Sequence, residues 1–160
     1  MSENYTGTDI SGQDFSGRDL AGAKFYGATC NGTNFKDANL SKADFYGATC
    51  TNANFNGANL EGARLYGANF GPVTARHAKF GKANCYGAHF AESDLVGASF
   101  HESNLYGADF HGVNLQGGNL TRANCSGTDF SKADLKNVDA IGANLTGANL
   151  AGADTQGWQT

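Results

Sequence analysis

The hydrophobic positions of this chain repeat every five residues. From Ile10 to Leu150 every fifth residue is apolar, mostly Leu, Phe or Cys, without one insertion or deletion, and Ala75 and Ala140 are the smallest members. The residue two places earlier is small, usually Ala, and the residue one place earlier is usually Asn or Asp. Glycine usually stands two places after the central residue. The repeated unit is A-(N/D)-(L/F)-X-G.

This period fits neither a regular helix nor a straight strand. A helix needs apolar residues at i, i+3, i+4 and i+7, and a strand needs strict alternation. Here the first and third residues of each unit alternate like a strand, and two polar or glycine residues follow. An odd period along a straight strand would send successive units to opposite faces. The chain must therefore turn in every unit, and Gly, Asn and Asp tolerate the positive φ that turns often need.

The tyrosines indicate how many units close one coil. Five of them recur at intervals of 20 residues, each followed by glycine: Tyr26, Tyr46, Tyr66, Tyr86 and Tyr106. Twenty residues are four units, which predicts a four-sided coil. Coils stacked at the sheet spacing of ~4.8 Å would make residues 6–157 a rod of about seven and a half coils, roughly 36 Å long.

These units resemble the pentapeptide-repeat family, whose motif is A-(D/N)-L-X-X. About thirty consecutive units over residues 6–157 carry the resemblance. It implies an all-β fold, a right-handed quadrilateral parallel β-helix, here with about seven to eight coils of 20 residues. Residues 1–160 would form one domain with short tails. The handedness is an implication of the resemblance and not of the spacing.

The coil predicts which side chains meet in the interior. Central residues 20 apart should stack, so that Phe70, Phe90, Phe110 and Phe130 form one aromatic ladder. A second ladder should contain Phe15, Phe35 and Phe55. Each coil of such a solenoid contacts only its neighbours. The two ends would expose unpaired edges and apolar core, which favours capping or self-association.

Composition narrows the classes of partner. The 160 residues carry a net charge of −4, and 16% are charged, which argues against direct nucleic-acid binding and against a basic membrane patch. The N-terminus lacks a basic segment followed by an apolar run, and no stretch approaches ~18 apolar residues. We therefore expect a cytoplasmic protein without a membrane segment.

The four cysteines are expected to be buried free thiols. Cys30 and Cys50 are one coil apart, and ~4.8 Å between their Cα atoms would allow a disulfide. A cytoplasmic chain favours reduced thiols. Cys85 and Cys125 are two coils apart, too far to bridge, and no CxxC spacing indicates zinc.

No motif indicates catalysis. The chain has no G-x-S-x-G, no P-loop and no recognisable Cys–His spacing, so we predict no enzyme, no cofactor and no metal. His89 and His111 fall on the same side, near Asp109, but lack further ligands. We therefore expect His89 and His111 to be solvated surface residues, and His77 and His101 likewise.

Two features are candidate contact surfaces. The ladder of Tyr26, Tyr46, Tyr66, Tyr86 and Tyr106 should point outward, where it either binds a partner or only stabilises its face by stacking. Mixed charges beside it argue against an ice template.

Residues 71–82 are the least regular stretch. Pro72 replaces the usual glycine, which predicts a bulge or a missing ladder bond, and Arg76, Lys79 and Lys82 gather nearby as solvated charges or a contact site.

The favoured function is a non-enzymatic protein-interaction or scaffold module with an unassigned protein partner, and a weak homodimer through a helix end or the tyrosine face. The resemblance implies one alternative, because some pentapeptide-repeat proteins protect gyrase by mimicking DNA as dimers. Here the acids are scattered and interrupted by cations, and the C-terminal segment contributes only Trp158 as a large apolar residue. A designed repeat without a partner fits the varied surface poorly.

Overall fold

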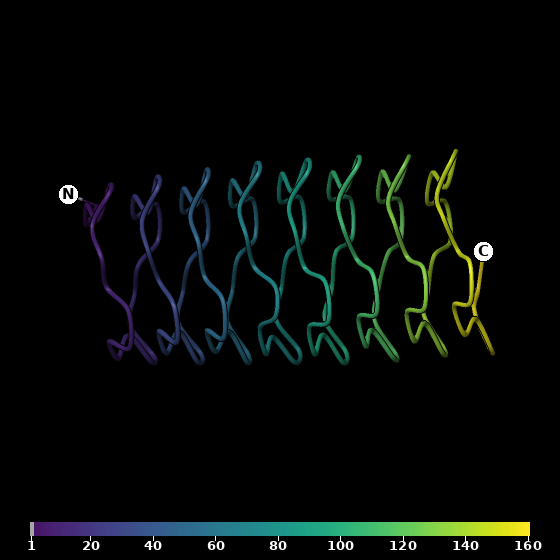
Figure 1. Ribbon diagram of the computed structural model, residues 1–160, viewed down its shortest axis with the longest axis horizontal. Helices are drawn as coiled ribbons and strands as arrows, with labels where there is room; N and C mark the ends of the chain where they lie inside the picture. Colours follow the sequence, from purple (N-terminus) through teal and green to yellow (C-terminus); the bar gives the residue numbers. More distant parts are fainter. Residues whose placement is uncertain (1) are drawn as a thin grey trace.

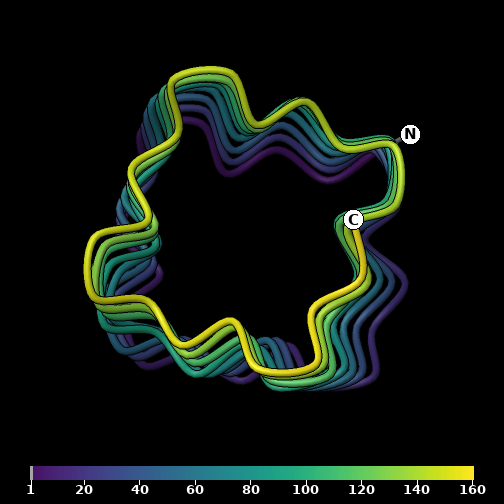
Figure 2. The same ribbon diagram turned by 90° about the vertical axis from the view of Figure 1, so that its right-hand side faces the viewer.

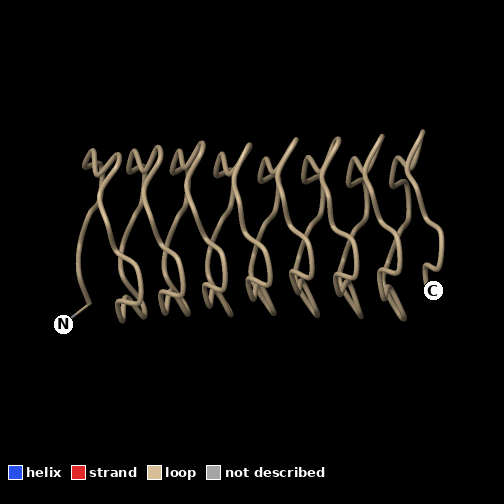
Figure 3. Ribbon diagram, turned by 90° about the horizontal axis from the view of Figure 1, so that it is seen from below, coloured by secondary structure: helices blue, strands red, loops and turns tan. Residues whose placement is uncertain are grey.

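The chain forms a straight rod of stacked coils. The computed structural model describes residues 2–160, and its two ends lie at opposite ends of the rod (Figure 1). Seen along the axis, each coil is four-sided (Figure 2). Residues 2–160 contain no helix, and thus none able to cross a bilayer, and no extended strand (Figure 3). The fold is a right-handed quadrilateral β-helix, as the resemblance implied.

Single bridge residues, rather than strands, hold the coils together. Each bridge is parallel and joins a residue to the one 20 positions later, from Asn4↔Lys24 to Asp139↔Gln159. The 20-residue coil is thereby confirmed, and residues 2–160 make close to eight coils. Met1 lies outside the described residues. We number the four faces by the apolar central residues of the repeats, which recur every 20 residues on one face. The first central residue of face 1 is residue 5, and those of faces 2, 3 and 4 are residues 10, 15 and 20.

The corners are tight turns, except at Gly71–Pro72. The amide of Gln13 donates to the carbonyl of Ile10 at 3.1 Å, and Gly12 between them has φ of 70°. Positive φ at the third residue of a turn is the signature of a type II β-turn, which favours glycine there. Other residues take this conformation at ten corners: Asp37, Lys42, Asn52, His77, Lys82, Glu92, Glu102, Arg122, Lys132 and Asn137.

Asp37, Asn52 and Asn137 take positive φ at corners, as expected, but the Asn/Asp column, which stands before the central residues, has another role. Its residues precede the turn, so their tolerance of positive φ is not what places them there. Their side-chain oxygens accept a backbone amide two residues later, as from Ser11 to Asp9 at 2.9 Å. Their amide groups also bond along the column, as from Asn34 to Asp14 at 2.9 Å. The column therefore satisfies amides that no neighbouring coil can reach.

A complete repeat leaves no amide without an acceptor. In residues 38–42, Ala38 donates within its turn, Asn39 to the preceding coil, and Leu40 and Lys42 to the following coil. Ser41 donates to the Asn39 side chain at 3.2 Å. Backbone polar groups must be paired when they are buried. The repeat meets that requirement without any regular strand.

The interior is filled with apolar side chains. Both expected aromatic ladders are present. Phe35 stacks on Phe15 and Phe55 at 5.5 and 4.9 Å between ring centroids, nearly parallel. In the other ladder the rings tilt, and Phe90 meets Phe70 at 50° and Phe110 at 43°. The tilt distinguishes the second ladder, in which the rings are not stacked flat.

The large aromatic residues change faces half-way along the rod. In the first three coils they occupy faces 1 and 3, as Phe45 and Phe55 do, whereas in the next two they occupy faces 2 and 4. Ala75 lies at this change and is fully buried. The Phe70 ring stacks on Phe55 at 4.8 Å, in the column that Ala75 continues. Ala75 therefore makes room for the Phe70 ring at this change of faces.

The first coil covers the core with polar residues. Its four positions that elsewhere carry Ala hold Glu3, Thr8, Gln13 and Arg18. Arg18 pairs with Glu3 at 2.7 Å and lies over the Phe15 ring at 5.1 Å. The last coil differs, because its apolar residues, such as Leu145, Leu150 and Trp158, are only partly buried.

Candidate interaction surfaces

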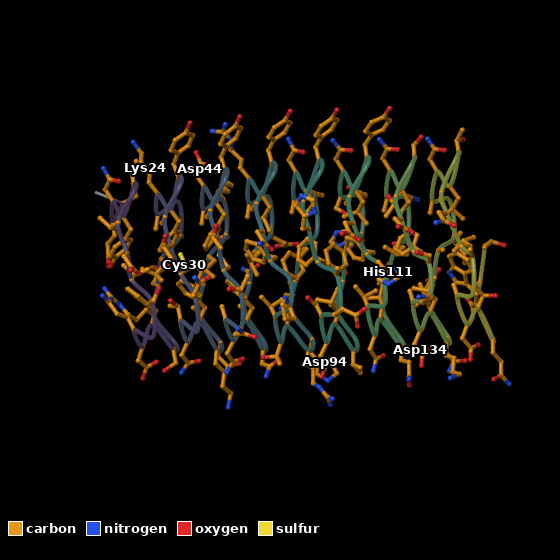
Figure 4. The ribbon with its side chains drawn as sticks, viewed as in Figure 1. Lys24, Cys30, Asp44, Asp94, His111 and Asp134 are labelled. Carbon is orange, nitrogen blue, oxygen red and sulfur yellow. The ribbon has the colours of Figure 1, made fainter. Side chains whose placement is uncertain are left out.

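The five tyrosines form one continuous stack on face 1. Adjacent ring centroids are 4.9–5.3 Å apart, and the rings are within 11° of parallel. A row of rings projects from the edge that carries Lys24 and Asp44 (Figure 4). Because each ring covers the face of its neighbour, the stack presents ring edges and hydroxyls to solvent. Tyr26 at one end is 50% exposed and Tyr86 within the stack 38%.

The column beside the tyrosines is mostly neutral. Arg64 pairs with Asp44 at 3.2 Å, so these two charges compensate each other. Lys24 precedes them, and asparagines follow from residue 84 onward. The tyrosine stack therefore stands on a face with little net charge.

The cysteines are free and buried, as expected. Burial raises the pKa of the Cys125 thiol to about 12, and it also raises that of Cys85. The pKa of Cys50 is raised well above its ordinary range by burial and by the neighbouring Cys30. Thiols act as nucleophiles and metal ligands only as thiolates. These four are therefore core residues rather than reactive groups.

Pro72 disturbs the hydrogen-bond ladder of face 2. Proline has no N–H to donate to Ala91, and the Asn52 amide bonds to the Pro72 carbonyl at 2.6 Å instead of to Gly71. The turn bond from Val73 to Phe70 is replaced by a buried hydroxyl. Ser93 accepts the Val73 amide at 3.0 Å and donates to the Phe70 carbonyl at 3.3 Å. The predicted loss of a ladder bond at Pro72 is confirmed.

A hollow of about 470 Å³ lies beside this irregularity. Two successive coils carry the small residues Gly71 and Ala91 at the outward position after the centre, where His111 follows in the next coil. We call it the Pro72 hollow; its lining residues are Asn69, Gly71, Pro72, His89, Ala91, Glu92 and Asp109. We did not predict it from the sequence, although two small residues 20 apart in an outward column were a visible signal.

The family of the chain follows from these repeats. The family model of pentapeptide repeats (8 copies) matches residues 6–41, 33–71, 43–81, 83–122 and 119–154. The chain belongs to the pentapeptide-repeat family. Among curated proteins no similar sequence was found.

Several solved structures are similar to this chain, and two of them share its fold. A trypsin-treated form of QnrB1, a plasmid-mediated fluoroquinolone resistance protein, is 23% identical with a TM-score of 0.60, over 94% of this chain and 74% of that one. The protein alr5209 from Nostoc Pcc 7120 is 23% identical with a TM-score of 0.51, over 57% and 84%. A thylakoid-lumen protein of Arabidopsis thaliana is 36% identical over 66% of each chain, with a TM-score of 0.44. At such identities the first two show the fold alone.

Several carboxylates of this pentapeptide-repeat protein have cationic partners. On face 3, opposite the tyrosines, Asp94 pairs with Arg76 at 2.6 Å, and Lys136 lies 3.3 Å from Asp134 and 3.0 Å from Asp154 (Figure 4). Hydrogen bonds from Lys136 and from the Gln156 amide lower the pKa of Asp154. The cations of residues 76–82 do not form one patch, because Arg76 lies on face 3 and Lys82 lies on face 4, near Glu102.

The histidines contact separate carboxylates. His89 lies 3.7 Å from Asp109, and His111 lies 3.7 Å from Glu92 and 2.9 Å from the Ser131 hydroxyl. His89 and His111 thus do not share Asp109 as a side-chain partner. Within residues 2–160 no three His, Cys, Asp or Glu side chains gather into a metal-binding group.

Proposed function

We propose that this pentapeptide-repeat protein is a non-enzymatic scaffold that binds a protein partner through its tyrosine stack, Tyr26, Tyr46, Tyr66, Tyr86 and Tyr106. The observation that carries the proposal is a row of five parallel, solvent-facing rings on a rigid frame. Tyrosine is enriched in protein interfaces and their energetic hot spots. Rings already held by stacking lose little conformational freedom on binding.

The stacking geometry favours a protein over a single-stranded nucleic acid. Bases bind to aromatic side chains through ring faces, and inside this stack the faces are covered by neighbouring rings. A net charge of −4 also opposes phosphate binding. The non-enzymatic part of the proposal is supported by the four cysteines, which are buried and therefore out of reach of a substrate.

A comparison of two double variants tests the proposal. Tyr66→Thr/Tyr86→Thr interrupts the stack with a residue that already occupies this column at Thr146. The control, Lys36→Thr/Gln116→Thr, shortens two side chains at the same outward position on the opposite face. The variants are first shown to have the same thermal stability. Each is then immobilised, and the proteins that it captures are compared. We expect partners lost with the tyrosine variant and retained with the control; equal capture by both would overturn the proposal.

The gyrase-protection alternative finds less support. A mimic of DNA needs rows of free carboxylates, whereas Asp44, Asp94 and Asp134 are paired with Arg or Lys. The similarity to QnrB1 reaches only the fold. A supercoiling assay with gyrase and a quinolone separates the two functions, and we expect no protection at micromolar protein. Protection that survives Tyr66→Thr/Tyr86→Thr would establish the alternative.

A further inference from the structure

The Pro72 hollow has a floor of backbone and two walls of side chains. By their positions in the repeat, the small residues Gly71 and Ala91 lie in the middle, which we call the floor, with Asn69, His89 and Asp109 on one side and Pro72 and Glu92 on the other. Its volume of about 470 Å³ lies within the range of ligand sites, ~300–1,000 Å³. The hollow is open to solvent on face 2. It thus has the size for a side chain that enters from another surface.

The floor carries two hydrogen-bond acceptors without a donor. Gly71 and Ala91 belong to the column that follows the central residues of face 2. Other carbonyls of this column, such as those of Thr51 and His111, accept a hydrogen bond from an amide of the preceding coil. The Ala91 carbonyl loses this donor because Pro72 has no N–H, and the Gly71 carbonyl loses it because Asn52 bonds to Pro72 instead. Among residues 2–160 no amide replaces either donor. The disturbance at Pro72 therefore leaves two carbonyl oxygens for another donor.

The walls carry two carboxylates with which no Arg or Lys of residues 2–160 pairs. Glu92 and Asp109 have only imidazoles as ion-pair partners, His111 and His89, each at 3.7 Å. By contrast, Asp94 beside the hollow is paired with Arg76 at 2.6 Å. The hollow thus combines two carboxylates with two carbonyls, and these groups only accept hydrogen bonds.

Beside the Asn69 amide and the His89 ring, these four acceptors favour an occupant that is a cation with several donors. Within residues 2–160 the side chains do not assemble a group of three metal ligands, which argues against a metal ion. A guanidinium carries five N–H donors in a planar fork and remains charged. The Pro72 ring and the Ala91 methyl are apolar surfaces against which the methylene stem of an arginine can pack. We propose that the Pro72 hollow binds an arginine side chain of a protein partner.

This site is separate from the tyrosine stack, with which it shares only the premise that the partner is a protein. It lies on face 2, whereas the tyrosines lie on face 1. The two proposals can therefore fail independently, because the test below uses no tyrosine variant and no captured partner.

The test is a titration followed by ¹H–¹⁵N NMR. The probe is N-acetyl-L-arginine amide, and its uncharged isostere N-acetyl-L-citrulline amide serves as the matched ligand. We expect millimolar binding of the arginine probe, with shifts concentrated at the amides of Gly71, Val73, Ala91 and Glu92. The citrulline probe should bind at least tenfold more weakly. Equal binding of both probes, no saturable shifts, or shifts spread over all acidic positions would overturn the proposal.

Two variants connect binding to the hollow. Glu92→Gln/Asp109→Asn removes both charges and keeps the side-chain oxygen of residue 109 that accepts the His111 amide at 3.0 Å. We expect this double variant to bind the arginine probe at least tenfold more weakly. Glu61→Gln/Asp139→Asn makes the same change in charge on face 4 and should leave binding unchanged. An equal loss in both variants would show general electrostatic attraction and overturn the site.

Discussion

Single hydroxyl and amide groups replace some of the hydrogen bonds that are lost where the repeat is interrupted. At Ser93 one hydroxyl serves both the Val73 amide and the Phe70 carbonyl, which the Pro72 turn separates. Where Thr74 replaces the usual Asn or Asp, the Arg76 amide instead bonds to Asn56 of the preceding coil at 2.8 Å. Each of these two side chains supplies a hydrogen-bond partner that the regular repeat would have provided.

Ser93→Ala should destabilise the protein by about 1–3 kcal/mol, since it leaves a buried amide and a buried carbonyl unpaired. Ser103→Ala is the matched control. The Ser103 hydroxyl is also buried and donates to the Phe100 carbonyl. When this hydroxyl is removed, the carbonyl still accepts the Ser103 amide at 3.1 Å. We expect less than about 1 kcal/mol for the control by urea denaturation. Similar losses in both variants would contradict the bridging role of Ser93.

Asp129 should make stability sensitive to acid. The Ser131 hydroxyl and amide lower the pKa of Asp129 in the folded chain. A lowered pKa contributes stability that is present above the pKa of the unfolded chain, ~3.9, and is lost as the pH falls through the folded value. Asp129→Asn keeps an oxygen for the Ser131 amide but cannot be protonated. Its melting temperature should fall less than that of the wild type between about pH 5 and pH 3, and an equally steep fall would contradict the prediction.

At the scale of the coil, the large and small core side chains change faces between the third coil and the fourth. The third coil places Phe45 and Phe55 on faces 1 and 3, and the fourth places Phe70 and Phe80 on faces 2 and 4. A four-sided interior has room for two rings in these coils, and their neighbours are Leu, Cys or Ala. Ala75 is small because Phe70 fills the adjoining space.

Ala75→Phe should therefore overpack the fourth coil and destabilise it by about 1–3 kcal/mol. Phe70→Cys alone should lose about 3–5 kcal/mol, as large-to-small core changes do. The double variant restores the arrangement of the third coil on these two faces, with Cys50 as its precedent. We expect it to be more stable than the sum of the two changes by about 0.5–3 kcal/mol in a denaturation cycle. Additive losses would show that the two positions do not share space.

The whole molecule is a closed rod around one continuous apolar core, with the four thiols inside. In native protein, 5,5′-dithiobis(2-nitrobenzoic acid) should react with none of them within minutes, because burial shields them and raises the pKa of Cys125 to about 12. In guanidinium chloride all 4 should react. Release of only two thiols would reveal a bridge between Cys30 and Cys50. Rapid reaction of the native protein would contradict a closed core.

The sequence by itself determined the repeat, the four-sided coil, the stacking of residues 20 apart and the outward tyrosine stack. These features follow from spacing, because a period of five forces a turn in each unit and a rigid coil converts sequence distance into position. It also indicated the weak point at Pro72.

Only the tertiary structure decided how side chains share space and hydrogen bonds between coils. The Asn/Asp column accepts amides instead of providing positive φ, Ala75 accommodates Phe70, and Ser93 bridges the interrupted turn. The Pro72 hollow arises because small residues coincide with a shifted hydrogen bond at the same place. Such outcomes depend on ring orientation and on which donor reaches which acceptor, and a repeating pattern of residue types contains neither.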